Sequence, residues 1–171
     1  ARPSVLVLKG GPDAERPVSI MSGTGVAAAL RESGKFNIIE RTIDKPDAEE
    51  LAAMPGDIIF PVLHGHWGEG GPLQALLEAI GRPFVGCGSR AAALAMDKMR
   101  TKERVAARGV RTPQAAEIGL NETCPVKAPA VIKPVDDGSS VDIRICHTEE
   151  QLIEARRQLH PKRRRLMVEQ Y

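Results

Sequence analysis

Apolar residues in the first half of the chain follow two alternating patterns, short uninterrupted runs and stripes at helical spacing. The runs predict strands over residues 5–8, 36–43, 57–63 and 84–85. The stripes predict helices over residues 17–32, 47–54 and 72–80. Strands and helices alternate, and the run at 57–63 is apolar enough to be buried on both faces. We therefore predict an α/β fold with a doubly wound, Rossmann-like parallel sheet over residues 1 to about 95.

The pattern changes after Met96. Asp97 is suited to cap a helix over residues 98–108, and Gly109 is suited to end it. Further along, the sequence predicts an extended segment at 113–118 and strands at 130–133 and 141–146, which flank a hairpin-like loop. A Thr148–Gln151 capping box predicts the start of a helix that ends near Leu159. The chain finishes with a predicted strand, "LMVEQY". The change predicts two domains, residues 1–96 and an α+β domain at residues 97–171.

Composition and charge narrow the class of protein. Of the 171 residues, 42% are hydrophobic and 27% are charged, which is typical of a globular chain that buries its own core. The net charge of +2 is too small to indicate a nucleic acid or membrane partner. Three widely spaced cysteines without a CxxC pair favour reduced thiols in a cytoplasmic protein. No apolar run approaches the ~20 residues that a membrane span requires.

A lysine interrupts the apolar run within residues 130–141, "AVIKPVDDGSSV". The β-branched residues before it favour a strand, and Pro134 indicates that this strand lies at a sheet edge or ends there. A buried ammonium group needs an anionic partner, so two interpretations are open at this point. Lys133 either reaches water or pairs with Asp136 or Asp137, or it enters a cleft and neutralises a phosphate beneath the loop.

Two glycine-containing loops follow predicted strands, at the carboxyl ends where open α/β sheets bind ligands. The first, "GGPDAER" at residues 10–16, places Glu15 either at a ligand or as the cap of the next helix. Its two glycines do not form the GxGxxG pattern of dinucleotide-binding proteins. The second, "HGHWGEGG" at residues 64–71, contains four glycines, which indicates backbone that passes close to another group or donates N–H groups into a concavity.

Two other candidate sites carry weaker signals. His64, His66 and Glu69 could contribute to a metal site, but no third His or Cys neighbour is evident, so a zinc site is not favoured. The basic run "KRRR" at residues 162–165 has no interleaved aromatic residues. It is therefore predicted to be a solvated turn rather than a nucleic-acid surface.

Five segments taken together resemble one family. They are "GGPDAERPVS", "HGHWGEGGPLQALLE", "VGCGSRAAALAMDKMRTK", "VIKPVDDGSSVD" and "MVEQY", in this order and spacing. The combination is similar to the D-alanine–D-alanine ligases of the ATP-grasp superfamily, from about residue 5 to residue 171. The resemblance implies that residues 1–96 form the pre-ATP-grasp substrate domain and that residues 97–171 form the first, incomplete part of an α+β ATP-grasp domain.

The resemblance implies ATP-dependent ligation of two D-alanines for peptidoglycan synthesis. In that reaction ATP phosphorylates the carboxylate of one D-alanine, and the amine of the second attacks the acylphosphate. Phosphoryl transfer depends on positioning and on charge neutralisation, which lysines and N–H donors supply. The resemblance therefore favours the interpretation in which Lys133 enters a cleft and neutralises a phosphate beneath the loop.

The same resemblance implies roles for individual residues. Glu15 is expected to hold the ammonium group of the first D-alanine, and His64 to lie beside the reacting carboxylate. Lys98 and Lys133 are expected to contact the nucleotide phosphates. Gly138, Ser139 and Ser140 are expected to form the loop over the triphosphate. Ser139 is also expected to be linked to the substrate glutamate. Glu169 and Tyr171 are expected to begin the adenine pocket.

Four positions depart from the family pattern. Asp13 stands where serine is usual, Pro17 replaces a common glutamate, and Gly70 replaces the aspartate of GEDG. Asp142 takes the place of a glycine and adds negative charge near the expected triphosphate. That charge is unfavourable unless Mg²⁺ or Arg144 offsets it. These departures bear on substrate choice and on closure of the loop.

Members of the family continue well past residue 171. The resemblance assigns the Mg²⁺ ligands, the arginine that stabilises the transferring phosphate and the far wall of the adenine pocket to that later part. We therefore expect a truncated chain, a proteolytic product or the product of a disrupted gene, inactive or nearly so. Its last strand is expected to be unpaired, with an apolar sheet edge left open.

Two alternatives to this function stay open. One is a related ATP-grasp ligase with another acceptor, for example a D-hydroxy acid. The other is a non-catalytic remnant that binds D-alanine or a partner protein. By analogy with the family we expect a homodimer formed through the first domain.

Overall fold

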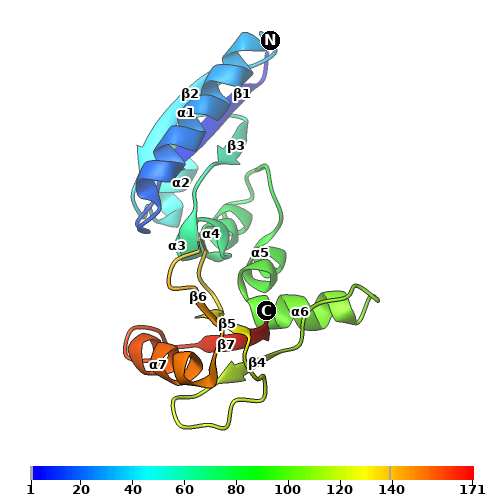
Figure 1. The fold of residues 1–171 in the computed structure, drawn as a ribbon. Coiled ribbons are helices and arrows are strands. Elements are labelled where there is room, and N and C mark those ends of the chain that lie inside the picture. Colours follow the sequence, from blue (N-terminus) through cyan, green and yellow to red (C-terminus); the bar gives the residue numbers. More distant parts are fainter. Residues whose placement is uncertain (1, 139) are drawn as a thin grey trace. The chain divides into compact units, whose positions relative to one another are not determined.

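The chain forms two compact units, Ala1–Ala93 (unit 1) and Leu94–Tyr171 (unit 2). The structure is a computed structural model that describes residues 2–138 and 140–171. Each unit contains its own sheet, and Figure 1 follows their elements along the chain. The sheet of unit 1 is parallel and that of unit 2 is antiparallel, which confirms the predicted fold class.

In unit 1, the described strands form a parallel sheet in the order β2-β1-β3. The strands are β1 (Ser4–Gly10), β2 (Asn37–Ile43) and β3 (Ile58–Pro61). The helices are α1 (Arg16–Glu32), α2 (Ala48–Ala53), α3 (Gly65–Glu69), α4 (Pro72–Ala79) and most of α5 (Ser89–Met96). The predicted alternation of strands and helices is confirmed. Helices α3 and α5 were not predicted, because α3 is short and α5 has only one buried residue, Ala92.

Alternate side chains of β1 face opposite layers of unit 1. Leu6 and Leu8 belong to a core cluster with residues of α2 and α4. Val5 and Val7 pack with Ala27 of α1, the helix that runs beside β1 in Figure 1. The central strand is therefore buried on both faces, as a doubly wound sheet requires.

Strand β3 is less buried than its apolar sequence predicts. Ile59 is fully buried, but Ile58 and Phe60 are partly exposed. Among the described residues, its outer neighbour is a single parallel bridge between Ile59 and Phe84. The predicted strand at residues 84–85 is thus reduced to this bridge, and it covers little of β3.

Ser19 of α1 ties together the segments that follow β1 and β3. Its hydroxyl accepts a hydrogen bond from the Gly10 N–H at 2.9 Å and donates one to the Val62 carbonyl at 2.5 Å. The side chain is fully buried. The end of β1 and the segment between β3 and the second loop therefore share one buried anchor.

Replacing Ser19 with alanine should lower the free energy of unfolding by about 1–3 kcal/mol, because the buried Gly10 N–H loses its partner. Urea denaturation followed by circular dichroism measures this change. Ser33→Ala is the control, since the Ser33 hydroxyl donates to the Leu30 carbonyl and accepts from the Lys35 N–H at the exposed end of α1. The control should change stability by less than about 0.5 kcal/mol. Equal losses in the two variants would contradict the anchoring role.

In unit 2, the described strands form an antiparallel sheet in the order β4-β7-β5-β6. They are β4 (Ala115–Ile118), β5 (Ala130–Pro134), β6 (Arg144–Cys146) and β7 (Leu166–Gln170). The helices are α6 (Lys98–Ala106), α7 (Glu149–Leu159) and the end of α5. β5 and β6 pair antiparallel with Ala130 opposite Cys146, which confirms the hairpin-like arrangement.

One prediction about the edges of this sheet is wrong. The last strand is not unpaired, because β7 is hydrogen-bonded to β4 on one side and to β5 on the other. Of the two alternatives for Pro134, the structure confirms the end of the strand, since β5 ends at Pro134 and lies between β7 and β6. The error concerns pairing between segments far apart in the sequence, which local patterns do not reveal.

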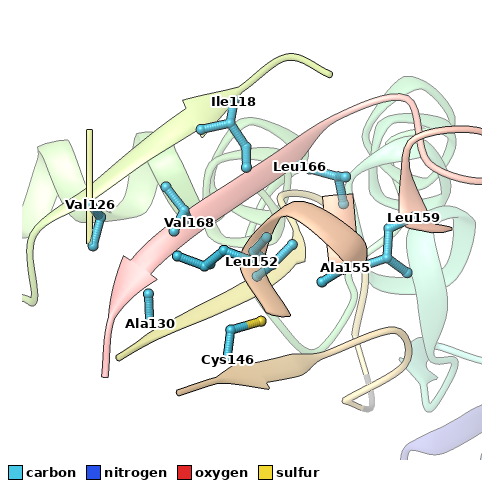
Figure 2. Close-up of a cluster of buried hydrophobic side chains, with 10 residues drawn as sticks. Ile118, Val126, Ala130, Cys146, Leu152, Ala155, Leu159, Leu166 and Val168 are labelled. Atoms are coloured by element: carbon cyan, nitrogen blue, oxygen red, sulfur yellow. The ribbon is translucent and has the colours of Figure 1, made fainter. Parts of the chain in front are cut away.

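A hydrophobic cluster joins α7 to this sheet, as Figure 2 shows. Leu152, Ala155 and Leu159 are buried and follow the i, i+3, i+7 spacing of one helix face. They pack with strand residues such as Ala130 and Val168, which are fully buried. The cluster fixes the strands that carry the candidate site described below.

Two local predictions in unit 2 need correction. The Gln151 side chain accepts a hydrogen bond from the His147 N–H at 2.6 Å instead of from Thr148, so only half of the capping box forms. β6 begins at Arg144 and not at residue 141. The reason is that Ser140 and Asp142 have left-handed φ values of 58° and 57°, which interrupt an extended strand.

Candidate functional site

Two lysines share a small cavity in unit 2. Lys98 is the first residue of α6, and Lys133 lies near the end of β5. The cavity has a volume of about 190 Å³ and is lined by Lys98, Lys133, Pro134, Asp137, Gly138, Ser140, Val141 and Ile143. The structure thus brings together both predicted phosphate lysines and two of the predicted loop residues.

The ammonium group of Lys98 is held by backbone oxygens of the loop after β5. Its Nζ donates to the carbonyl of Asp137 at 2.5 Å and lies 3.4 Å from that of Val135. Burial, and then the nearby charge of Lys133, lower the pKa of Lys98 below its ordinary value. An anion between the ammonium groups of Lys98 and Lys133 would stabilise both charges, and phosphate oxygens provide such an anion.

Lys133 meets a different carboxylate from those considered above. Its Nζ donates to Glu169 Oε1 at 2.7 Å, so its partner is Glu169 rather than Asp136 or Asp137. Lys102 Nζ contacts the other oxygen of Glu169 at 2.5 Å. Burial acts to raise the pKa of Glu169, but the hydrogen bonds from Lys102 and Lys133 outweigh it, so that the pKa is lowered.

Lys102 is a candidate site residue to which the family resemblance assigned no role, although it ends the third of the five segments. It lies one helical turn after Lys98 on α6, so both lysines share one helix face. Its Nζ also donates to Thr112 Oγ1 at 2.5 Å. The i, i+4 spacing of the two lysines in "DKMRTK" is a signal that could have identified it. Because Lys102 and Lys133 contact Glu169 through different oxygens, Glu169 restrains the direction of Lys133.

The remaining predicted nucleotide residues are only partly gathered at this cavity. Gly138 and Ser140 line it, whereas Ser139 lies outside the described residues. Tyr171 is exposed and lines a different cavity of about 410 Å³. Its ring meets that of His147 edge-on at 5.9 Å.

Asp142 is neutralised by an arginine from the "KRRR" run. Arg163 Nε and Nη2 each lie 2.7 Å from Asp142 Oδ2, and Arg163 Nη1 lies 2.6 Å from Asp137 Oδ2. Arg144, the partner expected from the sequence, is 3.9 Å away. The prediction of a solvated turn is wrong for Arg163 and Arg165, whose side chains are only 26% and 29% exposed.

Arg165 supports the start of α6. Its Nη1 donates to Asp97 Oδ2 at 2.6 Å, and its other nitrogens bond to both carboxylate oxygens of Glu117. Asp97 caps α6 as predicted, since its side chain accepts a hydrogen bond from the Arg100 N–H at 2.9 Å. Lys98 follows Asp97 directly, so this ion pair fixes the backbone from which Lys98 enters the cavity.

The predicted substrate residues lie at the carboxyl ends of parallel strands in unit 1. Glu15 occupies the N-cap position of α1 after β1, and His64 that of α3 after β3. His64 Nε2 lies 3.5 Å from Ser22 Oγ, and His64 Nδ1 lies 3.9 Å from Glu69 Oε2. The Glu15 side chain makes no capping hydrogen bond, so the capping interpretation lacks its usual contact.

Close packing explains the glycines of the second loop, much of which forms helix α3. A Cβ atom on Gly65 would lie 2.5 Å from Asp13 Cβ, and one on Gly68 would lie 2.5 Å from Leu63 Cβ. Asp13 Oδ2 also accepts a hydrogen bond from the Trp67 N–H at 3.0 Å. The interpretation as closely approaching backbone is therefore confirmed, and Asp13, a departure from the family pattern, joins the two loops of unit 1.

Metal-binding clusters and membrane-spanning helices are both absent from the described residues. Within residues 2–138 and 140–171, no three His, Cys, Asp or Glu side chains are grouped so that they could hold a metal ion. In the same part of the chain, no helix is both long enough and apolar enough to cross a membrane. We assign no metal ligand among these residues.

The two units define a class of protein. A parallel α/β unit, followed by an antiparallel sheet with two lysines at one cavity, is an arrangement of the ATP-grasp type. Two family models match the chain, "D-ala D-ala ligase N-terminus" over residues 39–87 and "D-ala D-ala ligase C-terminus" over residues 101–171. The chain belongs to the D-alanine–D-alanine ligase family.

Individual relatives agree with this assignment. The chain is 44% identical over 146 residues to the D-alanine–D-alanine ligase of Ruegeria pomeroyi, covering 84% of this chain and 47% of that protein. It is 39% identical over 171 residues to that of Aquifex aeolicus, covering 98% of this chain and 58% of that protein. The chain therefore spans about half the length of the curated relatives it matches.

Solved structures give the same result. A D-alanine–D-alanine ligase from Bacillus anthracis matches with a TM-score of 0.87 and 29% identity, covering 100% of this chain and 58% of that chain. A structure of a D-alanine–D-alanine ligase from Bacillus anthracis complexed with ATP matches with a TM-score of 0.85 and 27% identity. It covers 100% of this chain and 57% of that one.

Proposed function

We propose that this protein acts in the ATP-dependent ligation of two D-alanines to D-alanyl-D-alanine for peptidoglycan synthesis. The observation that carries the proposal is the cavity shared by Lys98 and Lys133, where burial and the second lysine lower the pKa of Lys98. Phosphate oxygens between the two ammonium groups would relieve this repulsion. Family membership and the likeness to a ligase complexed with ATP support the same function.

The proposed reaction has two steps. The carboxylate of the first D-alanine attacks the γ-phosphorus of ATP, and ADP leaves. The amine of the second D-alanine then attacks the acyl carbon, loses a proton, and inorganic phosphate leaves. Lys98 and Lys133 neutralise the phosphate oxygens, and the loop residues Gly138, Ser139 and Ser140 donate hydrogen bonds to them.

The two substrates are divided between residues 1–96, which hold D-alanine, and residues 97–171, which hold the nucleotide. Glu15 binds the ammonium group of the first D-alanine, and His64 lies beside the carboxylate that is phosphorylated. Glu169 and Tyr171 begin the adenine pocket, and Glu169 also directs Lys133.

Mg²⁺ is expected to accompany ATP, but its ligands are not assigned to this chain, because the described residues offer no suitable group of three side chains. The roles proposed above in the two reaction steps are therefore roles of protein side chains and backbone groups, and none is assigned to a metal ion. We expect a cytoplasmic homodimer without a nucleic acid or membrane partner. Size-exclusion chromatography with light scattering tests the dimer.

A direct assay tests the function. The protein at its natural length, given ATP, Mg²⁺ and D-alanine, should release ADP and phosphate and form D-alanyl-D-alanine in equal amounts. Parallel reactions with D-lactate as the second acceptor identify a D-hydroxy acid ligase. ATP consumption that does not depend on D-alanine would overturn the proposal. No consumption at all would also overturn it and would favour a non-catalytic remnant.

The affinity for ATP should fall as the pH rises toward the ordinary pKa of lysine. The pKa of Lys98 is lowered in the free protein, and a bound phosphate raises it again because an anion favours the charged form. Between these two pKa values binding takes up a proton, so the dissociation constant increases with pH in that window. Calorimetric titrations from about pH 7 to about pH 10 measure the effect. Lys98→Met should remove it, and an unchanged slope in that variant would contradict the assignment.

A further inference from the structure

Arg163 connects two acidic residues at the border of the lysine cavity. Asp137 lines the cavity, and Asp142 directly follows Val141, which also lines it. Arg163 lies in the turn after α7 and bonds to both carboxylates at 2.6–2.7 Å. We call these three residues the Arg163 bridge. Its side chains are between 21% and 33% exposed, so water screens them only in part.

The bridge changes the charge that a polyphosphate would meet. Lys98 and Lys133 bring two positive charges to the cavity, and Asp137 and Asp142 bring two negative charges to its border. Uncompensated carboxylates at the border of the cavity would offset much of the attraction between the lysines and an anion. A guanidinium group stays protonated at any physiological pH, and the hydrogen bond to Asp142 raises the pKa of Arg163 further.

The bridge also restrains the backbone next to the lysines. Asp137 Oδ1 accepts a hydrogen bond from the Gly138 N–H at 2.9 Å, and the Asp137 carbonyl accepts the one from Lys98 Nζ. Asp142 holds a left-handed φ of 57°, a conformation that aspartate tolerates better than most residues. Arg163 is therefore linked to Lys98 through Asp137, and it stabilises an aspartate where the family has glycine.

We propose that Arg163 is a positioning residue for the nucleotide triphosphate. By bonding to both Asp137 and Asp142, it offsets one of their two negative charges, which reduces their repulsion toward phosphate, and it keeps the Asp137 carbonyl on Lys98. This inference rests on the proposed binding of ATP. It adds a residue outside the segments that carry the family resemblance. It assigns the closest compensation of Asp142 to Arg163, at 2.7 Å, while Arg144 makes a longer ion pair with the same carboxylate at 3.9 Å.

The test compares the binding of ATP with that of adenosine, which carries no phosphate charge. Arg163→Gln should weaken ATP binding roughly tenfold and leave adenosine binding unchanged, because only the triphosphate meets the released carboxylates. The loss should shrink at high salt, where surface charges are screened. Adding Asp142→Gly should restore a large part of the affinity, since one of the two released carboxylates is then absent. Arg163→Lys keeps the charge but not the guanidinium group that bonds to both carboxylates. Its affinity for ATP should lie between those of Arg163→Gln and the wild type.

Calorimetry on the protein at its natural length measures these affinities, and circular dichroism checks that each variant is folded. Arg157→Gln is the matched control, because Arg157 is an exposed arginine of α7 that pairs with Glu154 on the same helix. It should bind ATP like the wild type. Unchanged ATP affinity in Arg163→Gln, or an equal loss for adenosine that Asp142→Gly does not reduce, would overturn the positioning role. A wild-type protein that does not bind ATP would overturn the proposed function instead.

Discussion

Replacing Lys133 with alanine should weaken ATP binding by about 10- to 100-fold, the loss that follows when a charge-assisted contact worth ~1.5–3 kcal/mol is removed. Lys133 lines the cavity that it shares with Lys98. The fold should survive the change, because Glu169 keeps its contact with Lys102 at 2.5 Å. Calorimetric titration with ATP and with adenosine measures the effect, and the loss should be larger for ATP.

Lys35→Ala is the control for this experiment. Lys35 is an exposed lysine between α1 and β2 in unit 1, and its removal changes the net charge by the same amount. The affinity of this variant for ATP should equal that of the wild type. If Lys133→Ala also bound ATP with wild-type affinity, Lys133 would serve only as the partner of Glu169, and the phosphate role would be wrong.

Replacing Glu15 with glutamine should reduce dipeptide synthesis by about 100-fold or more, since a misplaced substrate costs at least that much in rate. The amide preserves the size of the side chain but removes the negative charge that is proposed to hold the ammonium group of D-alanine. ATP binding should not change, because that binding is assigned to the other unit. Release of ADP, coupled to a spectrophotometric assay, measures turnover at several D-alanine concentrations.

Glu32→Gln provides the comparison for Glu15. Glu32 is exposed at the opposite end of α1, so its variant loses the same charge away from the strand ends. Turnover should be unchanged. Dipeptide synthesis at the wild-type rate by Glu15→Gln would refute the substrate role. Loss of ATP binding in Glu15→Gln would contradict the division of substrates between the two parts of the chain.

Local sequence patterns were sufficient for most of the elements, and the family resemblance was sufficient for the identity of the cavity lysines. The apolar run at β1 and the stripe of α1 predicted a buried strand and its covering helix, since side-chain periodicity follows directly from backbone geometry. Asp97 predicted the start of α6 because a cap acts within one turn. The ordered motifs singled out Lys98 and Lys133, and the structure places both at one cavity.

The partners of charged residues were not predictable in the same way. Lys133 has Asp136 and Asp137 as its nearest acidic residues in the sequence, but it bonds to Glu169, which lies across the β5–β7 pair. Asp142 has Arg144 close by, but it bonds to Arg163. Several carboxylates and cations were equally near along the chain, so only distances in space could select among them.

Short-range order along the chain thus accounts for most of the strands and helices and for the Asp97 cap, because these depend on contacts within a few residues. The two lysines were singled out by the family resemblance of the ordered motifs. The central position of β7, the contact of Asp13 with Trp67 and the Arg163 bridge depend on the folded chain. They join residues roughly 20 to 55 positions apart, and their energies depend on distance and burial. Neither quantity exists until the sheets and their covering helices have packed.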